Sequence, residues 1–177
     1  MRIISGTHKG RQIFPDKSFN ARPTTDFAKE NLFNVLLNYM DIEDSRVLDL
    51  FSGTGSISYE FASRQAGEII SVEQNYKHYA FIKRMTEELG FKNMKVFKTD
   101  VFIACKKLKG RKFDLIFADP PYNLEQITDI PSAIFDNELL AENGLAVIEH
   151  PATIDFSTHP RFSEQRQYGS VNFSIFK

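Results

Sequence analysis

Four consecutive residues, Asp119-Pro120-Pro121-Tyr122, offer the clearest chemistry in the sequence. They follow Phe113 to Ala118, an almost continuous apolar run that is typical of a strand covered on both faces. Proline lacks an N–H for a sheet ladder and fixes its φ, so two in succession end the strand and stiffen the chain. The result is a carboxylate, a backbone carbonyl and an aromatic ring at a strand's carboxyl end, where open α/β sheets bind ligands. Aspartate and proline also favour ordinary turns, so a functional interpretation needs support from elsewhere in the chain.

That support comes first from Asp49-Leu50-Phe51-Ser52-Gly53-Thr54-Gly55, which connects a predicted strand to a predicted helix. Glycines at such a turn let a ligand approach the backbone and leave amides pointing outward at a helix N-terminus. Glu73 ends the next predicted strand, 20 residues after Gly53, where an acidic side chain can accept hydrogen bonds from ribose hydroxyls. Asp100 follows the third predicted strand in the same way.

The glycine pattern favours one class of nucleotide cofactor. A dinucleotide fold favours Gly-x-Gly-x-x-Gly, but Ser58 occupies the third glycine position, and the sequence has no phosphate-binding Gly-Lys-Ser/Thr motif. An acidic residue followed by two glycines suits a cofactor with a charged amino-acid end and no phosphate, which is S-adenosylmethionine (SAM). We therefore predict SAM as the cofactor. The expected contacts are Asp49, Phe51, Gly53, Gly55, Glu73, Asp100, Val101 and Phe102.

From Arg46 onward, predicted strands and helices alternate five times. The predicted strands are 47–51, 68–73, 94–98, 113–118 and 144–149, and the helix before the fifth is expected to run through Phe135, Leu139 and Leu140. Residues 161–168 and 171–177 are two more predicted strands, joined by Gly169-Ser170 without a helix. This pattern predicts an α/β domain with a doubly wound, mostly parallel seven-stranded sheet and a terminal antiparallel β-hairpin.

Residues 2–5 and 11–14 form a predicted N-terminal β-hairpin around Gly6 to Gly10. Residues 1–22 hold five basic residues and one acidic residue, although the whole chain has a net charge of −1. A basic arm on a nearly neutral body is compatible with phosphate contact, and equally with an ordinary solvated hairpin. We therefore divide the chain into a basic hairpin and linker, residues 1–23, and a SAM-dependent domain, residues 24–177.

Composition sets the remaining expectations. A chain of 177 residues with 42% hydrophobic and 25% charged residues is typical of one globular domain. No apolar run approaches the roughly 18 residues of a membrane span, and the N-terminus lacks a signal-peptide core. The single Cys105 cannot form an internal disulfide, which fits a reducing cytoplasm. The four histidines show no ligand spacing, so we expect no metal, and without a long exposed apolar seam we expect a monomer.

Together the Asp119-to-Tyr122 motif and the Asp49-to-Gly55 turn predict methyl transfer to an exocyclic amine of a base. Such an amine is a poor nucleophile because its lone pair is delocalised into the ring. If Asp119 and the Pro120 carbonyl accept its two N–H bonds, the lone pair is drawn out of conjugation. Tyr122 would stack on the base, which is worth roughly 1–3 kcal/mol, after the base leaves its own stack. Positioning and fixed electrostatics then carry catalysis. The candidate catalytic residues are Asp119, Pro120, Pro121 and Tyr122.

The Asp-Pro-Pro-Tyr motif resembles the signature of amino-methyltransferases, which act on adenine N6, cytosine N4, guanine N2 or glutamine N5. The chain as a whole resembles the RsmD family of 16S rRNA guanine-N2 methyltransferases. The resemblance rests on Met1 to Gly6, Lys9-Gly10-Arg11, Arg22-Pro23-Thr24 with Glu30, Phe33 and Asn34, Val47 to Gly55, Phe113 to Tyr122, and Gly144 to His150. One departure is Ser52-Gly53-Thr54-Gly55, where Ala-Gly-Ser-Gly is commoner, but these exchanges replace small residues with small ones.

The resemblance implies a class I SAM-dependent methyltransferase fold and methylation of N2 of guanine 966 in 16S rRNA. The substrate would be the small ribosomal subunit or an assembly intermediate in the cytoplasm, with ribosomal proteins as further partners. The resemblance assigns Asp49, Gly53 and Gly55 to the first cofactor motif, Glu73 to the ribose, Asp100 to the adenine, and Asp119, Pro120 and Tyr122 to catalysis. It assigns Arg2, Lys9, Arg11, Arg22 and Thr24 to the RNA.

Three alternatives remain open at the level of sequence. A DNA adenine-N6 methyltransferase would normally carry a recognition domain, for which 177 residues leave little room. Protein glutamine-N5 methyltransferases usually carry Asn in place of Asp119. A SAM-binding, RNA-binding ribosome assembly factor without catalysis would have no need for the intact Asp-Pro-Pro-Tyr segment.

Overall fold

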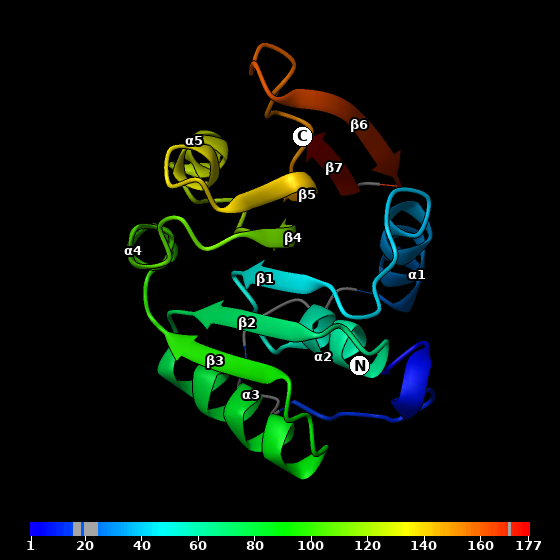
Figure 1. The fold of residues 1–177 in the computed structure, drawn as a ribbon. Coiled ribbons are helices and arrows are strands. Elements are labelled where there is room, and N and C mark those ends of the chain that lie inside the picture. The colour runs from blue at the N-terminus through cyan, green and yellow to red at the C-terminus, as the bar shows by residue number, and fades with distance from the viewer. Residues whose placement is uncertain (16–18, 20–24, 170) are drawn as a thin grey trace.

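The computed structural model describes residues 1–15, 19, 25–169 and 171–177. A seven-stranded sheet in the order β3-β2-β1-β4-β5-β7-β6 runs through the middle of the molecule (Figure 1). Strands β1 to β5 pair in parallel, whereas β7 pairs antiparallel with both β5 and β6. The strands are β1 (Arg46–Leu50), β2 (Glu68–Glu73), β3 (Met94–Lys98), β4 (Phe113–Ala118), β5 (Leu140–His150), β6 (Phe162–Tyr168) and β7 (Val171–Phe176).

Helices cover both faces of this sheet. The helices are α1 (Asp26–Leu36), α2 (Ser56–Ser63), α3 (Tyr76–Glu88), α4 (Val101–Lys107) and α5 (Ile130–Phe135), with 3₁₀ turns η1 (Gly6–His8) and η2 (Ile127–Asp129). Side chains cap several N-termini: Thr25 accepts the Ala28 N–H at 3.2 Å, and Asn75 accepts the Lys77 N–H at 2.9 Å. Such caps satisfy backbone donors that have no partner inside the helix, so they fix where each helix begins.

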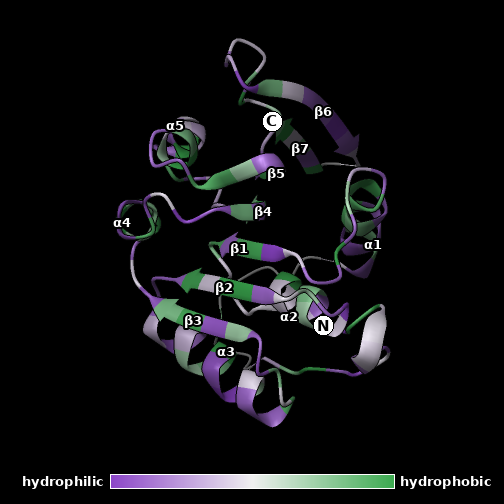
Figure 2. Ribbon diagram, in the orientation of Figure 1, coloured by the Kyte–Doolittle hydropathy of each residue, from purple (hydrophilic) through white to green (hydrophobic). Residues whose placement is uncertain are grey.

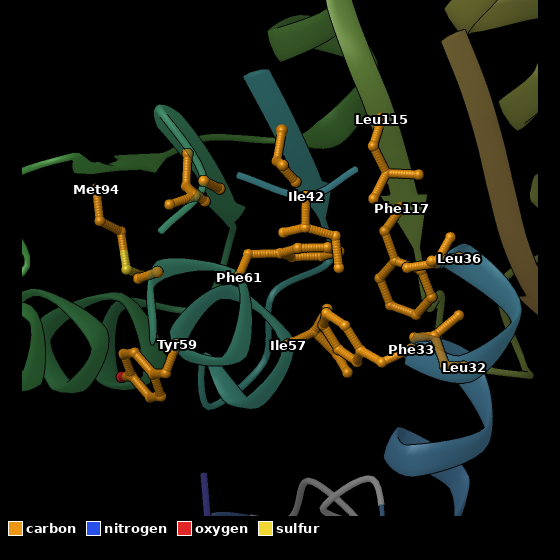
Figure 3. Packing of buried hydrophobic residues seen from close by; sticks show 14 of the residues in the cluster. Leu32, Phe33, Leu36, Ile42, Ile57, Tyr59, Phe61, Met94, Leu115 and Phe117 are labelled. Atoms are coloured by element: carbon orange, nitrogen blue, oxygen red, sulfur yellow. The ribbon is translucent and has the colours of Figure 1, made fainter. Parts of the chain in front are cut away.

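Two hydrophobic layers hold the helices to the sheet. One packs α1, α2 and α3 against residues such as Val47, Leu115 and Phe117, and Figure 3 shows Phe33 and Phe61 meeting near Phe117 in this layer. The other packs α4 and α5 against alternate residues of the same strands, such as Leu48 and Ile116. Because both faces are covered, the central strands are mostly hydrophobic, whereas polar and apolar residues alternate along α3 (Figure 2).

The fold predicted from the sequence is confirmed, with local corrections. The predicted helix through Leu139 and Leu140 is wrong: α5 ends at Phe135, and Leu140 already belongs to β5. The reason is the chain reversal after α5, where Glu138 has a φ of 54° and the Phe113 N–H donates to Leu139 O at 2.8 Å. A helix cannot continue through a left-handed residue, so β5 begins earlier than predicted.

The N-terminal segment forms less regular structure than the predicted hairpin. In the described part of the chain it has one antiparallel bridge, Arg2 to Gln12, with the 3₁₀ turn η1 between its arms. Further backbone bonds join Ile3 N–H to Arg11 O at 3.0 Å and Ile13 N–H to Met1 O at 2.9 Å. Ile3 and Ile13 are buried against the α1–α3 layer, so this N-terminal hairpin packs on the domain. In the ranges that the structure describes, no helix is both long and apolar enough to cross a membrane.

Candidate active site

The glycine turn and the Asp-Pro-Pro-Tyr motif meet at the point where the strand order of the sheet reverses. From β1 the chain proceeds to β2 and β3 on one side of the sheet and later to β4 and β5 on the other. The gap outside the carboxyl ends of β1 and β4 is therefore the topological switch point, where open α/β sheets bind ligands. The glycine turn follows β1 and Asp119 follows β4, and the Asp119 N–H donates to Leu50 O at 3.5 Å.

Glu73 fixes the shape of the glycine turn. Its Oε2 accepts the Gly53 N–H at 2.8 Å and its Oε1 accepts the Asn75 N–H at 2.6 Å. Gly53 has a φ of +55°, a left-handed conformation that favours glycine. A carboxylate offers about four lone-pair sites, so these two bonds are compatible with the predicted role toward ribose hydroxyls.

The surroundings of the two glycines differ. A Cβ built on Gly53 meets, among the described atoms, only Phe51 O within 4 Å, at 3.9 Å. A Cβ built on Gly55 would lie 2.6 Å from the Tyr59 ring. The missing side chain therefore leaves the backbone of Gly53 accessible to a ligand. At Gly55 the missing side chain leaves room for the ring of Tyr59. The open face of Gly53, beside a carboxylate and without a phosphate cradle, fits the amino-acid and ribose parts of SAM.

Asp49 lies inside the protein, 1% exposed. Its carboxylate accepts a hydrogen bond from the Ser58 hydroxyl, and Ser58 Oγ lies 2.6 Å from Ser71 Oγ. Burial raises the pKa of Asp49 to about 7, opposed by the bonds from Ser58 and Ser52 and assisted by the charge of Glu73. The structure thus places this carboxylate under the turn, where it links β1, α2 and β2. A direct contact with the cofactor stays a prediction.

The remaining predicted cofactor residues surround the same edge of the sheet. Asp100 Oδ1 caps α4 by accepting the Phe102 N–H at 2.9 Å and the Ile103 N–H at 3.1 Å. Val101 is buried, and Phe102 and Phe51 are partly buried against the α4–α5 layer. Phe51 has a φ of 62°, which ends β1 one residue earlier than predicted. Glu73 pairs with Lys98, the last residue of β3. Asp100 and Phe102 follow Lys98 closely in the chain, so they lie at the same edge of the sheet as Glu73.

Asp119 is accompanied by a residue that was not among the predicted site residues, Glu149. Ala118 pairs with Ile148, so Asp119 and Glu149 follow at the same level on adjacent parallel strands. The Tyr122 hydroxyl donates to Glu149 Oε1 at 3.0 Å. Burial raises the pKa of Asp119 well above its ordinary value, and the charges of Glu149 and Asp49 add to this effect. Glu149 is the acidic last residue of a predicted strand, the same sequence signal that identified Glu73. The sequence alone could therefore have identified Glu149 as a site residue.

The predicted RNA-binding residues lie partly in the described chain. Lys9 and Arg11 are exposed, and Arg2 Nε pairs with Asp26 Oδ2 at 3.1 Å. Arg22 and Thr24 lie outside the described residues. Met1 Sδ lies 3.6 Å from the Thr54 hydroxyl, so the N-terminal hairpin adjoins the glycine turn. The tip of the hairpin lies further away, because Thr7 and His8 contact Ser63 and Leu89 at the C-terminal ends of α2 and α3. The hairpin therefore extends from the glycine turn along α2.

Glu60 anchors this hairpin. It is fully buried on α2 and accepts the Ile4 N–H at 2.8 Å and the Ser5 N–H at 2.9 Å. Arg64 Nε donates to the same carboxylate at 2.9 Å, and the buried Lys29 Nζ lies 3.8 Å from it. Burial lowers the pKa of Lys29, and the charge of Glu60 opposes that effect most strongly. The internal carboxylate of Glu60 thus helps to hold the hairpin, together with Ser63, whose hydroxyl donates to Ser5 O at 2.6 Å and accepts the His8 N–H at 2.9 Å.

Comparisons with known proteins agree with this arrangement. The model of the family described as conserved hypothetical protein 95 matches residues 1–177. Ribosomal RNA small subunit methyltransferase D of Haemophilus influenzae is 32% identical over 182 residues, which cover 100% of this chain and 93% of that protein. A solved structure of a hypothetical protein from Thermus thermophilus has a TM-score of 0.87 at 25% identity, covering 100% of this chain and 99% of that one. The structure of SMU.776 complexed with SAH shares the fold, with a TM-score of 0.67 at 21% identity, over 87% of this chain and 50% of that one.

Proposed function

The chain belongs to the conserved hypothetical protein 95 family, the RsmD family, and on this premise we propose that it methylates the exocyclic N2 of a guanine in 16S rRNA. At the coarser level the chain is a SAM-dependent rRNA methyltransferase. The proposal adds the guanine, its N2 atom and, by family resemblance, position 966 of the small-subunit RNA. It includes action as a monomer in the cytoplasm, on the subunit or an assembly intermediate that contains ribosomal proteins.

One observation carries the proposal: Asp119 and Tyr122 follow β4 at the switch point, directly beside the glycine turn that follows β1. The residues of that turn would hold SAM, with Gly53 providing backbone access and Glu73 and Asp100 accepting from the nucleoside hydroxyls and amine. When bound there, SAM supplies an electrophilic methyl group on a sulfonium. The acceptor amine must then reach the same edge of the sheet, which is where Asp119 lies.

The residues of this chain would activate and orient the amine. The Asp119 carboxylate and the Pro120 carbonyl accept the two N–H bonds of N2, so its lone pair is no longer delocalised into the ring. The raised pKa of Asp119 makes its carboxylate a stronger base than an exposed aspartate. This suits it to take the proton that N2 loses on gaining a methyl group. Tyr122, 48% exposed, offers a ring face for stacking while its hydroxyl is held by Glu149.

The basic residues of the N-terminal hairpin would bind the RNA backbone. Lys9 and Arg11 are exposed on the N-terminal hairpin and Arg2 lies next to Asp26, so they supply positive charge along an element whose first residue adjoins the glycine turn. Phosphate contacts of this kind fix the register of an RNA, whereas the base that enters the site is read by its own edge. Since a duplex or stacked base cannot reach Asp119, the proposal includes extrusion of the target guanine.

The test is transfer of a labelled methyl group from SAM to small subunits isolated from cells that lack this protein, followed by mass mapping of the labelled nucleotide. The expected product is a single N2-methylguanine in 16S rRNA. Label in adenine N6, or in the glutamine of a protein, would replace the proposal with one of the alternative amino-methyltransferases. SAM binding and RNA binding without any transfer would indicate a non-catalytic assembly factor.

A further inference from the structure

Two carboxylates lie side by side at the reacting end of the sheet. Leu115 and Phe117 of β4 and Leu145 and Val147 of β5 all face the α1–α3 layer. Two-residue alternation places Asp119 and Glu149 on that same face, one step beyond the paired residues Ala118 and Ile148. The effect of Glu149 on the pKa of Asp119 agrees with this proximity.

Tyr122 links the second carboxylate to the surface where a base would stack. Its hydroxyl donates to Glu149 Oε1 at 3.0 Å, while Glu149 itself is only 8% exposed and Tyr122 is 48% exposed. The bond orients the Glu149 carboxylate relative to the tyrosine ring. A carboxylate accepts several hydrogen bonds at once, so accepting from Tyr122 is compatible with accepting from a ligand as well.

Adjacent carboxylates suit only one of the common bases. When both carboxylates are ionised in the complex, each is purely an acceptor and favours a donor group on the ligand, in addition to the bond that Glu149 accepts from Tyr122. Guanine presents the N2 amine next to a ring N1–H, two neighbouring donors on one edge. Adenine and cytosine present an exocyclic amine next to a ring nitrogen that is itself an acceptor, and that nitrogen would face a carboxylate oxygen without a proton between them. A site built to accept from an N–H strongly disfavours an analogue that lacks it.

We propose that Glu149 is a specificity-determining residue that accepts the ring N1–H of the target guanine while Asp119 accepts from its N2 amine. This inference rests on the proposed function and adds the means by which guanine is selected. Tyr122 serves in it as a positioning residue for Glu149 in addition to stacking on the base.

The experiment replaces the mapped target nucleotide, in reconstituted small subunits, with 2-aminopurine. This base keeps the 2-amine but has an acceptor at N1. Wild-type protein should prefer guanine by roughly 10-fold or more in kcat/KM, the effect of one charge-assisted hydrogen bond. In Glu149→Gln the side-chain amide can donate to N1 of 2-aminopurine, so the preference should shrink by roughly 10-fold or reverse. Because 2-aminopurine also lacks O6, the comparison is made between ratios for the two proteins, in which that loss cancels.

Glu142→Gln is the matched control, because Glu142 lies exposed on the same strand, β5, near its opposite end. It should keep the wild-type ratio. Tyr122→Phe retains the ring but loses the hydroxyl, so it should fall between wild type and Glu149→Gln. Glu149→Gln should still unfold cooperatively and bind SAM within a few-fold of wild type, which would show that the shift in base preference does not arise from misfolding.

The proposal fails if Glu149→Gln keeps the wild-type preference for guanine over 2-aminopurine. That failure leaves the proposed function intact, provided that wild-type protein still produces N2-methylguanine. If mass mapping of the wild-type product finds no N2-methylguanine, the proposed function and the role of Glu149 both fail. The two failures are therefore distinguished before any variant is measured.

Discussion

The backbone N–H of Gly53 donates to the carboxylate of Glu73 at 2.8 Å, which joins the turn after β1 to the end of β2. Because this bond uses the backbone, it leaves the side-chain position of Gly53 open, with Phe51 O at 3.9 Å as the nearest described atom. Gly53→Ala should therefore lose roughly 10-fold or more in SAM affinity, since the added methyl occupies the path of the cofactor. Its left-handed φ adds a stability loss of about 1–2 kcal/mol. Calorimetric titration with SAM measures the first effect and thermal unfolding the second.

Gly55→Ala is the contrasting variant. Its Cβ would lie 2.6 Å from the Tyr59 ring, so about 1–3 kcal/mol of overpacking is added to the backbone strain. Gly55→Ala should therefore lose more stability than Gly53→Ala. Gly53→Ala should lose more SAM affinity relative to the stability that it loses. Native SAM affinity in Gly53→Ala would mean that the cofactor does not approach this turn.

Asp119→Ala should separate binding from chemistry. SAM affinity should remain within a few-fold of wild type, because Glu73 and Asp100 are untouched, whereas methyl transfer should fall by roughly 100-fold or more. Asp119→Asn, which keeps an acceptor oxygen but not the charge, should retain more transfer than Asp119→Ala. Single-turnover transfer to small subunits, with SAM affinity measured in parallel, provides the comparison. Transfer at the wild-type rate in Asp119→Ala would remove this residue from the mechanism.

Asp49 predicts a pH dependence of stability. Its pKa is about 7 in the folded protein and 3.8 ordinarily, so the folded state holds the proton more tightly, and stability should decline as pH rises from about 4 to about 7. Asp49→Asn removes this titration. The variant should be more stable than wild type by about 2–4 kcal/mol at pH 8, and the gain should vanish near pH 4. Urea unfolding at pH 4, 6 and 8 measures it; a difference that is equal at every pH would show that Asp49 does not titrate in this range.

Glu60→Gln should loosen the N-terminal hairpin. Loss of the charge leaves Lys29 buried without its partner, and breaking a buried ion pair in this way typically costs about 3–5 kcal/mol. Hydrogen exchange of the Ile4 and Ser5 amides, which donate to Glu60, should accelerate more than exchange in the central strands. The control is Glu88→Gln, which removes an exposed pair with Arg84 and should cost less than about 0.5 kcal/mol. Unchanged exchange at Ile4 and Ser5 would refute the anchoring role.

Lys9 and Arg11 test the contact with RNA. Replacing both with Gln should raise KM for small subunits and lower the slope of log affinity against log salt by about 1 per residue. The variant should therefore differ most from wild type at low salt, because fewer counterions are released on binding. Lys106→Gln with Lys107→Gln, two charges at the far end of α4, should leave the slope unchanged. If both pairs behave alike, the hairpin has no special part in RNA binding.

Much of the fold follows from local sequence. The run Phe113 to Ala118 forms β4 with the predicted bounds, as does 68–73 for β2, because strands buried on both faces require continuous apolar residues. The edge strand β3 also has its predicted bounds, 94–98, although most of its residues are exposed or half-buried. Thr25, a residue type favoured at helix N-caps, caps α1. The motif at Asp119 and the glycine turn were also predictable, since glycine, proline and acidic residues at strand ends have strong local preferences.

Tertiary structure decided what depends on register and on contacts distant in sequence. Glu149 belongs beside Asp119 only because Ala118 pairs with Ile148, and pairing between strands is not encoded within either strand. Glu60 and Lys29 became an internal ion pair because α1, α2 and the N-terminal hairpin converge on one point. The early end of α5 at Phe135 likewise reflects pairing of the following residues with β4. The sequence determined which side chains stand at the strand ends, and only the packed sheet determined which of them are neighbours.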